Sequence, residues 1–393
     1  MAAILSGLGL LCACQPQPVA DFTSLDSFFE SHMTEHRIPG LTAAILTPDS
    51  TLWQQSYGYA DLDRKIPMTA RHIQNIASVS KTFTSTAVMQ LWEQGKLDLE
   101  ADINTYLPFS VRHPAFPEIP ITLHHLLTHT SSISDGPAYG ASYACGDPGV
   151  SLADWISGYL QVEGAYFDPE HNFLSDQPGT TREYSNVGYG LLGYIVAQVS
   201  GQSFSSYCQQ HIFSPLGMTH TGWFLADIDT SMHAQTYMWQ NPTQYERLAS
   251  SELIPDLLPA SDSGFVATCR YSFYNYPDGL LRTSVEDLSK YMKVWLNGGR
   301  YAGGQLLKPE TIDLMLTPQL SDNLRQGLCW SYTGFEAVWG HGGNDPGVQT
   351  AFYFSREKGI GMIILQNADA GGRSEKLEQM YQAGIRAVRE AQL

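Results

Sequence analysis

The sequence predicts an α+β fold, in which strands from both ends of the chain build one antiparallel sheet, flanked by helices, with a mostly helical domain inserted between them. Near the start, two apolar runs, 41–47 and 51–59, are separated by a Pro-Asp-Ser turn. Near the end, two more, 348–354 and 360–366, are separated by a short polar turn. Each pair is typical of a β-hairpin. The long segment between them, about 76–324, is dominated by helix and loop patterns.

The helices are predicted by apolar side chains that recur every three or four residues, the spacing of one helix face. One helix is expected over 21–37 and another over 374–391, at the two ends of the fold. In the middle part, a helix is expected over 186–200, and the capping-box pattern of 283–287 predicts the start of another. The aromatic and glycine-rich stretch 134–181 either walls a cleft or forms a surface insertion.

Residues 1–20 are interpreted as a signal peptide and tether, not as part of the fold. Leu11-Cys12-Ala13-Cys14 resembles a bacterial lipobox, which implies cleavage before Cys14 and a lipid on its sulfur. Ordinary signal cleavage is the alternative. Either way we expect an exported bacterial protein, periplasmic or anchored to the membrane as a lipoprotein. The folded domain would then be 21–393, with its sheet part at about 21–75 and 325–393 and the helical insertion between.

Charge and cysteine content restrict the partners and the covalent structure. The chain has 393 residues and a formal net charge of −17. Nucleic acids and anionic membrane surfaces require basic patches, so a small-molecule or peptide substrate is the expected partner. Four cysteines follow the leader, and an exported protein could form one or two disulfides from them in three alternative pairings: Cys145, Cys208, Cys269 and Cys329.

Ser78 and Lys81 form the candidate nucleophile motif. They lie three residues apart at the start of a helix expected to run to about Gln94, so they share one helix face. The unpaired N–H groups and the dipole at a helix start favour a developing negative charge. A serine with an amine one turn away is the minimal arrangement for an activated nucleophile. Taken alone, the motif is more often a solvated lysine on a Ser/Thr-rich helix start.

Two later segments could complete such a site. In Tyr184-Ser185-Asn186, a phenol beside a lysine can have its pKa lowered and can relay protons. The Asn186 amide can hold both a lysine and a substrate carbonyl. The glycines of 339–344, Trp-Gly-His-Gly-Gly-Asn, would let a substrate backbone approach a strand edge. Alone, Tyr184 could be a core tyrosine and His341 a loop histidine.

A helical metal pair is the alternative suggested by His125 and His129, which are four residues apart. No glutamate follows His125 in the manner of a metallohydrolase, and the sequence offers no evident third ligand. Packed or capping histidines are therefore expected here.

In this order, the three segments resemble the signature of the serine β-lactamase-like superfamily: Ser-x-x-Lys, Tyr-x-Asn and Lys/His-x-Gly. That superfamily includes class C β-lactamases, D,D-carboxypeptidases, D-aminopeptidases and related esterases. Four supporting stretches also match: 121–131, 184–189, 215–218 and 278–288. The resemblance covers about residues 22–390.

The resemblance implies an acyl-enzyme mechanism without a metal or an organic cofactor. Ser78 would attack a carbonyl and form the acyl-enzyme. Lys81 and Tyr184 would share the general acid–base work, and either could be the base.

The resemblance also implies how the substrate would be held. Asn186 would orient the lysine and the substrate, and His341 would supply polarity near the leaving group. Gly343 and Asn344 belong to the third motif, and the backbone N–H groups of Asn344 and Ser78 would form the oxyanion hole.

The third motif departs from the superfamily pattern. His341-Gly342-Gly343 stands where β-lactamases and carboxypeptidases have Lys-Thr-Gly, whose side chains bind the substrate carboxylate. Gly342 has no hydroxyl, and His341 is a weaker, pH-dependent cation. We therefore expect an exported serine hydrolase, an esterase or peptidase acting on esters or on amides without a nearby carboxylate. The alternatives are a D,D-peptidase or β-lactamase acting on cell-wall peptides or β-lactams, and a non-catalytic surface binding protein.

Overall fold

The computed structural model describes residues 22–239, 264–321, 323, 325–334, 337–369, 381–386 and 388. The predicted signal segment 1–20, including Cys14, lies outside these residues. So does most of the predicted C-terminal helix over 374–391, of which 381–386 and 388 are described, as helix.

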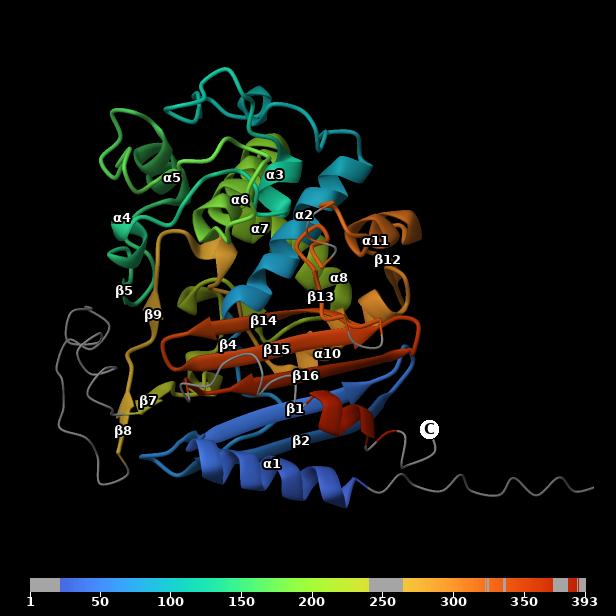
Figure 1. The fold of residues 1–393 in the computed structure, drawn as a ribbon. Helices are drawn as coiled ribbons and strands as arrows, with labels where there is room; N and C mark the ends of the chain where they lie inside the picture. Colours follow the sequence, from blue (N-terminus) through green and yellow to red (C-terminus); the bar gives the residue numbers. More distant parts are fainter. Residues whose placement is uncertain are drawn as a thin grey trace, which may run out of the picture.

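The predicted sheet from both ends of the chain is confirmed, as seven strands in the order β13-β14-β15-β16-β1-β2-β3 (Figure 1). The N-terminal part supplies β1 (Gly40–Leu46), β2 (Thr51–Asp61) and β3 (Ile66–Pro67). The C-terminal part supplies β13 (Ser331–Tyr332), β14 (Trp339–Asp345), β15 (Val348–Ser355) and β16 (Ile360–Gln366). Every neighbouring pair is antiparallel, and the β1–β16 pair joins the two ends of the chain.

Helices cover both faces of the sheet, so β1 and β16 are buried along their whole length. On one face, Phe29 of α1 (Thr23–His36) packs with Trp53 and with Ile364 of β16. On the other face, α10 (Val285–Leu296) packs against the alternate residues of the same strand, such as Leu365. The predicted capped start of α10 is confirmed, because Ser284 accepts the N–H of Asp287 at 3.1 Å.

The middle of the chain supplies the remaining helices, which lie mainly above the sheet in Figure 1, and all but one of the short strands. The helical turn η1 (Ala77–Val79) leads into α2 (Ser80–Glu93), which is followed by η2 (Ile103–Thr105), α3 (Leu123–Leu127), α4 (Pro137–Gly140), α5 (Leu152–Leu160), α6 (Asn186–Ser200), α7 (Phe204–Cys208), η3 (Gln209–Phe213), α8 (Ser214–Leu216), η4 (Leu225–Asp227), η5 (Thr230–Met232), η6 (Tyr276–Asp278) and α11 (Pro309–Met315). The short strands are β4 (Gln74–Asn75), β5 (Ala144–Cys145), β6 (Thr221–Gly222), β7 (Tyr237–Trp239), β8 (Phe265–Ala267), β9 (Tyr271–Ser272), β10 (Arg282–Thr283), β11 (Arg300–Tyr301), β12 (Gly304–Gln305) and β17 (Ala368–Asp369).

Glycines on α6 allow η6 to pack directly against it. A Cβ atom at Gly190 would collide with the Asn275 side chain, and one at Gly193 would collide with Pro277. This close approach offsets the cost of glycine in a helix interior. It also brings η6, with Asp278 at its end, next to α2.

One disulfide joins Cys145 of β5 to Cys269, just before β9. Cys208 and Cys329 are buried free thiols. The structure therefore selects one bond among the pairings that the sequence left open.

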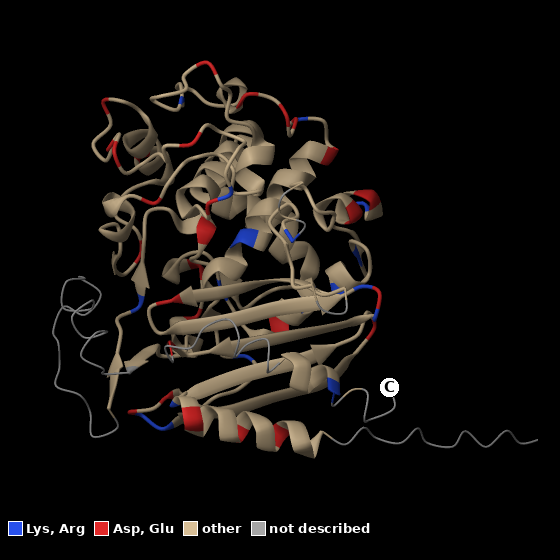
Figure 2. Ribbon diagram, in the orientation of Figure 1, with Lys and Arg blue, Asp and Glu red and all other residues tan. Residues whose placement is uncertain are grey.

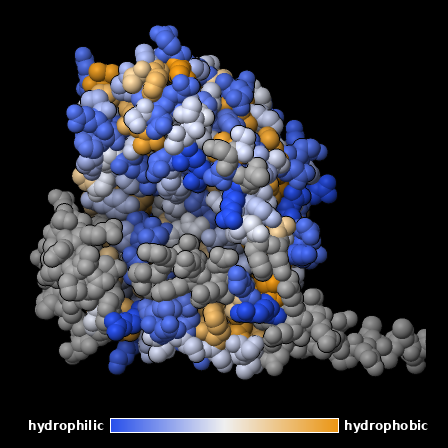
Figure 3. All heavy atoms as spheres, in the orientation of Figure 1, coloured by the Kyte–Doolittle hydropathy of each residue, from blue (hydrophilic) through white to orange (hydrophobic). Residues whose placement is uncertain are grey.

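Acidic residues outnumber basic ones in the full sequence, 39 to 22, and Figure 2 shows them along α1 and over the helical part. The face drawn in Figure 3 is mainly hydrophilic, with small, scattered hydrophobic patches. In the part of the chain that the structure describes, no helix has both the length and the apolar character needed to cross a bilayer.

Candidate active site

Ser78 lies in the single 3-10 turn of η1, immediately before α2 begins at Ser80. The α-helix thus starts two residues later than the sequence suggested. The turn is entered through Ala77, whose φ of 47° is unusual for a residue with a side chain. The Ala77 N–H donates to Asn75 Oδ1 at 2.7 Å, which holds this conformation. Ser78 itself stays partly exposed, so a substrate can reach it.

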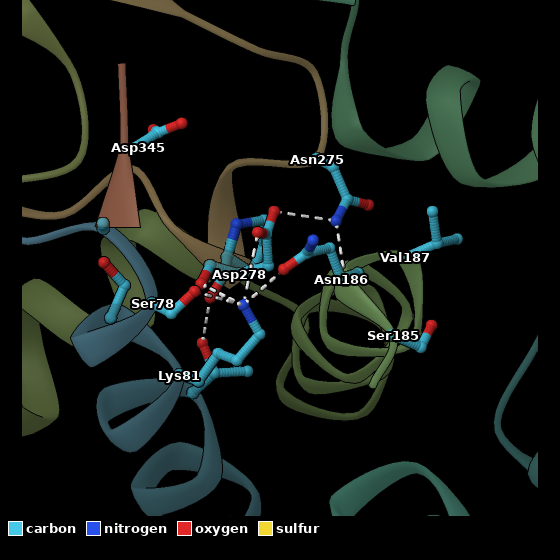
Figure 4. Close-up of polar contacts among 12 residues, drawn as sticks. Ser78, Lys81, Ser185, Asn186, Val187, Asn275, Asp278 and Asp345 are labelled. Carbon is cyan, nitrogen blue, oxygen red and sulfur yellow. Dashed lines mark hydrogen bonds and ion pairs between the residues drawn. The ribbon is translucent and has the colours of Figure 1, made fainter. Parts of the chain in front are cut away.

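Lys81 is wholly buried and points its ammonium at Ser78, with Nζ 3.2 Å from the serine Oγ. The same ammonium donates to Asn186 Oδ1 at 2.7 Å and to the carbonyl oxygen of Asp278 at 2.8 Å (Figure 4). It also forms an ion pair of 3.4 Å with Asp278 Oδ2. Burial disfavours the charge of Lys81, but Tyr184 and Asp278 outweigh it and hold its pKa above the ordinary value.

Tyr184 lies beside this lysine, with the Lys81 ammonium 4.9 Å from its ring centroid. The His129 ring lies 4.4 Å from the Tyr184 ring, centroid to centroid. The pKa of Tyr184 is raised by burial, although Lys81 and a hydrogen bond to Ser78 act in the opposite direction. The lowering expected from the lysine is therefore present but outweighed by burial.

The histidines at the site are neutral at pH 7. His341 lies 6.4 Å from Tyr184 between ring centroids, and its Nδ1 donates to the Gly342 carbonyl at 2.7 Å. Burial and the charge of Lys81 lower the pKa of His341 to about 4. Burial also holds the pKa of His129 well below its usual value, and its Nδ1 accepts the Ser185 N–H at 3.2 Å.

His125 has the capping role that the sequence favoured over metal binding. Its backbone N–H and its ring form a capping box with Thr122 at the start of α3. Within the described residues, no three His, Cys, Asp or Glu side chains come close enough together to hold a metal ion.

Asn186 is fixed at the N-terminus of α6 by a carboxylate that was not predicted. Asp135 Oδ2 accepts the Asn186 side-chain amide at 2.8 Å, and the Asp135 carboxylate also accepts the backbone N–H groups of Asn186 and Val187. These bonds orient the Asn186 side chain so that its amide oxygen faces Lys81. They also satisfy N–H groups that a helix start leaves without partners.

The third motif is a full strand, β14, which runs alongside η1. Gly343 makes this possible, because a Cβ atom there would collide with the backbone oxygen of Ile76. Thr350 of β15 donates to the same oxygen at 2.8 Å. Asn344, the next residue of β14, has an exposed side chain.

A second layer of polar groups supports the site, and none of it was predicted. Asn275 donates to the Asn186 carbonyl and to Asp278 Oδ1, both at 2.8 Å. Tyr139 donates to Asp278 Oδ2 at 3.0 Å. Because Tyr139 comes from the stretch 134–181, that stretch is a wall of the site at this point. No local spacing in the sequence could have revealed contacts between segments so far apart.

Comparisons with known proteins identify a family match and relatives of the chain. A model of the beta-lactamase family matches residues 25–386. Protein flp of Staphylococcus aureus is 28% identical over 274 residues, which cover 70% of this chain and 48% of that protein. The chain therefore spans only about half the length of this relative.

Solved structures share the fold. A penicillin-binding protein homologue from Pyrococcus abyssi has a TM-score of 0.66 at 25% identity, covering 89% of this chain and 74% of its own. The D-amino acid amidase of Ochrobactrum anthropi has a TM-score of 0.71 at 20% identity, covering 94% of this chain and 100% of its own.

Proposed function

This chain belongs to the β-lactamase family, a group of serine hydrolases, and from that premise we propose that it hydrolyses esters or amides without a nearby carboxylate through an acyl-enzyme on Ser78. The observation that carries the proposal is the 3.2 Å contact between Lys81 Nζ and Ser78 Oγ in a partly exposed turn. A serine hydroxyl held by a buried cation is set up for nucleophilic attack.

In the proposed reaction, the Lys81–Tyr184 pair first releases one proton to water. Ser78 Oγ then forms a bond to the substrate carbonyl carbon, and its proton passes to the deprotonated member of that pair. The oxyanion accepts hydrogen bonds from the N–H groups of Ser78 and Asn344. The proton then moves to the departing oxygen or nitrogen as its bond to the acyl carbon breaks. Water repeats the sequence on the acyl-enzyme and releases the acid, which regenerates Ser78.

The preference for substrates without a carboxylate is supported by the chemistry of the third motif. His341 is neutral at pH 7, because its pKa is about 4, and Gly342 offers no side chain. Neither residue can balance a substrate carboxylate. The likeness to a D-amino acid amidase supports amino-acid amides as one candidate substrate class.

A D,D-peptidase or β-lactamase activity is the second candidate, favoured by the match to the family model. Either enzyme would act outside the cytoplasm, in keeping with the proposed signal segment 1–20. A lipid on Cys14 would attach it to the membrane.

The test is turnover of a short-chain p-nitrophenyl ester and of nitrocefin by the wild type and by Ser78→Ala. We expect ester turnover by the wild type only and little nitrocefin turnover. Ester turnover that survives Ser78→Ala would refute the mechanism. Rapid nitrocefin turnover at neutral pH would instead favour the second candidate.

A further inference from the structure

We propose that Asp345 and the tyrosines around it form a subsite for an ammonium group on the acyl side of the substrate. The inference rests on the proposed reaction at Ser78 and deepens it by naming the substrate class: esters and amides of amino acids with a free amino group.

The position of Asp345 follows from the alternation of side chains along β14. His341, Gly343 and Asp345 share one face of this strand. Gly343 lies against the backbone just before Ser78, and His341 lies toward Tyr184. Asp345 therefore lies beyond Ser78, at the opposite end of the strand from the leaving-group side. Figure 4 shows it at the strand tip, outside the network of Lys81, Asp278 and Asn186.

The Asp345 carboxylate is only half satisfied. Tyr143 donates to its Oδ1 at 2.9 Å. Tyr271 also lies close enough to lower the pKa of Asp345 by hydrogen bonding, although its hydroxyl donates to the Pro346 carbonyl at 3.0 Å. The Oδ2 atom is buried and accepts no hydrogen bond of ordinary geometry from the described residues. The residue as a whole is 9% exposed. A buried carboxylate oxygen without a partner is costly. Burial accordingly raises the pKa of Asp345 to about 7.

Aromatic rings cluster around Tyr143, which donates to this carboxylate. The Tyr143 ring lies 4.6 Å from Phe273 and 5.7 Å from Tyr271, centroid to centroid. Tyr139 meets Tyr143 edge to face at 6.1 Å. Both Tyr139 and Tyr143 are partly exposed, so a ligand can reach them. Aromatic faces attract ammonium groups, and a carboxylate beside them adds a negative charge that favours the same ligand.

The charges nearby favour a cation over an anion. Asp278 lies close enough to raise the pKa of Asp345 by repulsion. Lys81 is already bound to Ser78, Asn186 and Asp278. The buried guanidinium of Arg282 donates to the carbonyls of Trp223 and Tyr271. Among the described residues, no cationic side chain forms an ion pair with Asp345, so a substrate ammonium would supply the missing partner.

The first measurement compares two chromogenic substrates that differ in one charge, alanine p-nitroanilide and its N-acetyl derivative, each in both configurations. We expect wild-type kcat/KM to favour the free amine by about tenfold or more, the strength of one charge-assisted hydrogen bond. Asp345→Asn should lower this preference ratio by a similar factor. Asp49→Asn, an exposed carboxylate in the β1–β2 turn, should leave the ratio unchanged.

Equal turnover of both substrates by the wild type would overturn the inference, as would a ratio that Asp345→Asn does not change.

If neither anilide is hydrolysed, the subsite is tested by calorimetric binding of alaninamide and N-acetylalaninamide to Ser78→Ala, which requires no reaction. Tighter binding of alaninamide, lost in the Ser78→Ala/Asp345→Asn variant, supports the subsite even if the proposed hydrolysis fails. No difference in binding refutes the subsite. Thermal unfolding confirms that each variant is folded, and if the Asp345 variant is not, Tyr143→Phe provides the second comparison.

Discussion

Lys81 and Asp278 form a buried ion pair across the candidate site, in which the ammonium lies 3.4 Å from Asp278 Oδ2 and also donates to the carbonyl oxygen of Asp278 at 2.8 Å. The two residues come from α2 and η6, far apart in the sequence. Buried ion pairs cost desolvation energy and contribute little net stability. We therefore interpret this pair, together with Tyr184, as the arrangement that keeps Lys81 charged beside Ser78.

Asp278→Asn should reduce the rate and change its pH dependence. Burial raises the pKa of Asp278 to about 6, so in the wild type this carboxylate takes up a proton as the pH falls through about 6. We expect kcat/KM for a neutral ester to fall in that range. In Asp278→Asn this acidic limb should disappear, because no proton is taken up there, and activity should be lower by about tenfold throughout.

The measurement is a pH profile of kcat/KM for both enzymes, with Asp313→Asn as an exposed control. An acidic limb near pH 6 that persists unchanged in Asp278→Asn would show that another group controls it.

The sequence was sufficient to predict the fold class and the proximity of neighbouring residues in the candidate site, such as Ser78 and Lys81. Ser78 and Lys81 are one helical turn apart, so their contact follows from spacing alone. Asp278 and Asn275 reach the site only because glycines of α6 let η6 approach, which is a property of tertiary packing. Similarly, 339–345 has too many glycines to be recognised as a strand from propensity, and its pairing with β15 determines its conformation.

Asp135→Asn should impair catalysis, because Asp135 holds Asn186 in position beside Lys81. The carboxylate holds the Asn186 amide and two backbone N–H groups, and an uncharged amide in its place can accept fewer of these bonds. We expect kcat to fall about ten- to hundredfold with a smaller change in KM, because the Asn186 side chain would no longer be held in hydrogen-bonding position beside Lys81. Asp154→Asn, another aspartate at a helix start, is the matched control, and an equal loss of kcat there would point to general destabilisation instead.

Gly343 and Gly342 should respond differently to the same substitution. A methyl group at Gly343 would collide with the Ile76 carbonyl, which is backbone and cannot move aside freely. We expect Gly343→Ala to lose about 1–3 kcal/mol of stability and most activity, because β14 would move away from η1. At Gly342 the nearest atom to such a methyl group is Tyr353 Oη at 3.4 Å, an ordinary contact. Gly342→Ala should therefore unfold like the wild type, and equal losses in thermal unfolding for both variants would contradict this account.

The Cys145–Cys269 bond should contribute substantially to stability. It closes a loop between residues 124 positions apart, and loops of this length give about 2–5 kcal/mol when cross-linked. Reductant should therefore lower the Tm of the wild type. A Cys145→Ser/Cys269→Ser variant should start from the lower Tm and show no further response to reductant. If reductant lowers the Tm of that variant too, the effect does not come from this bond.

Asp345→Asn should stabilise the protein, and more so at higher pH. The pKa of Asp345 in the folded protein is about 7, above its ordinary value of 3.8. The folded state thus binds the proton more tightly, and the stability gained from that proton is complete below about pH 3.8 and lost as the pH rises through about 7. Asparagine is uncharged at every pH and avoids this loss. The gain in Tm of Asp345→Asn over the wild type should therefore be larger at pH 8 than at pH 5, by the equivalent of about 1–3 kcal/mol. Thermal unfolding at both pH values measures it, and an equal gain at each would mean that Asp345 does not change its charge in this range.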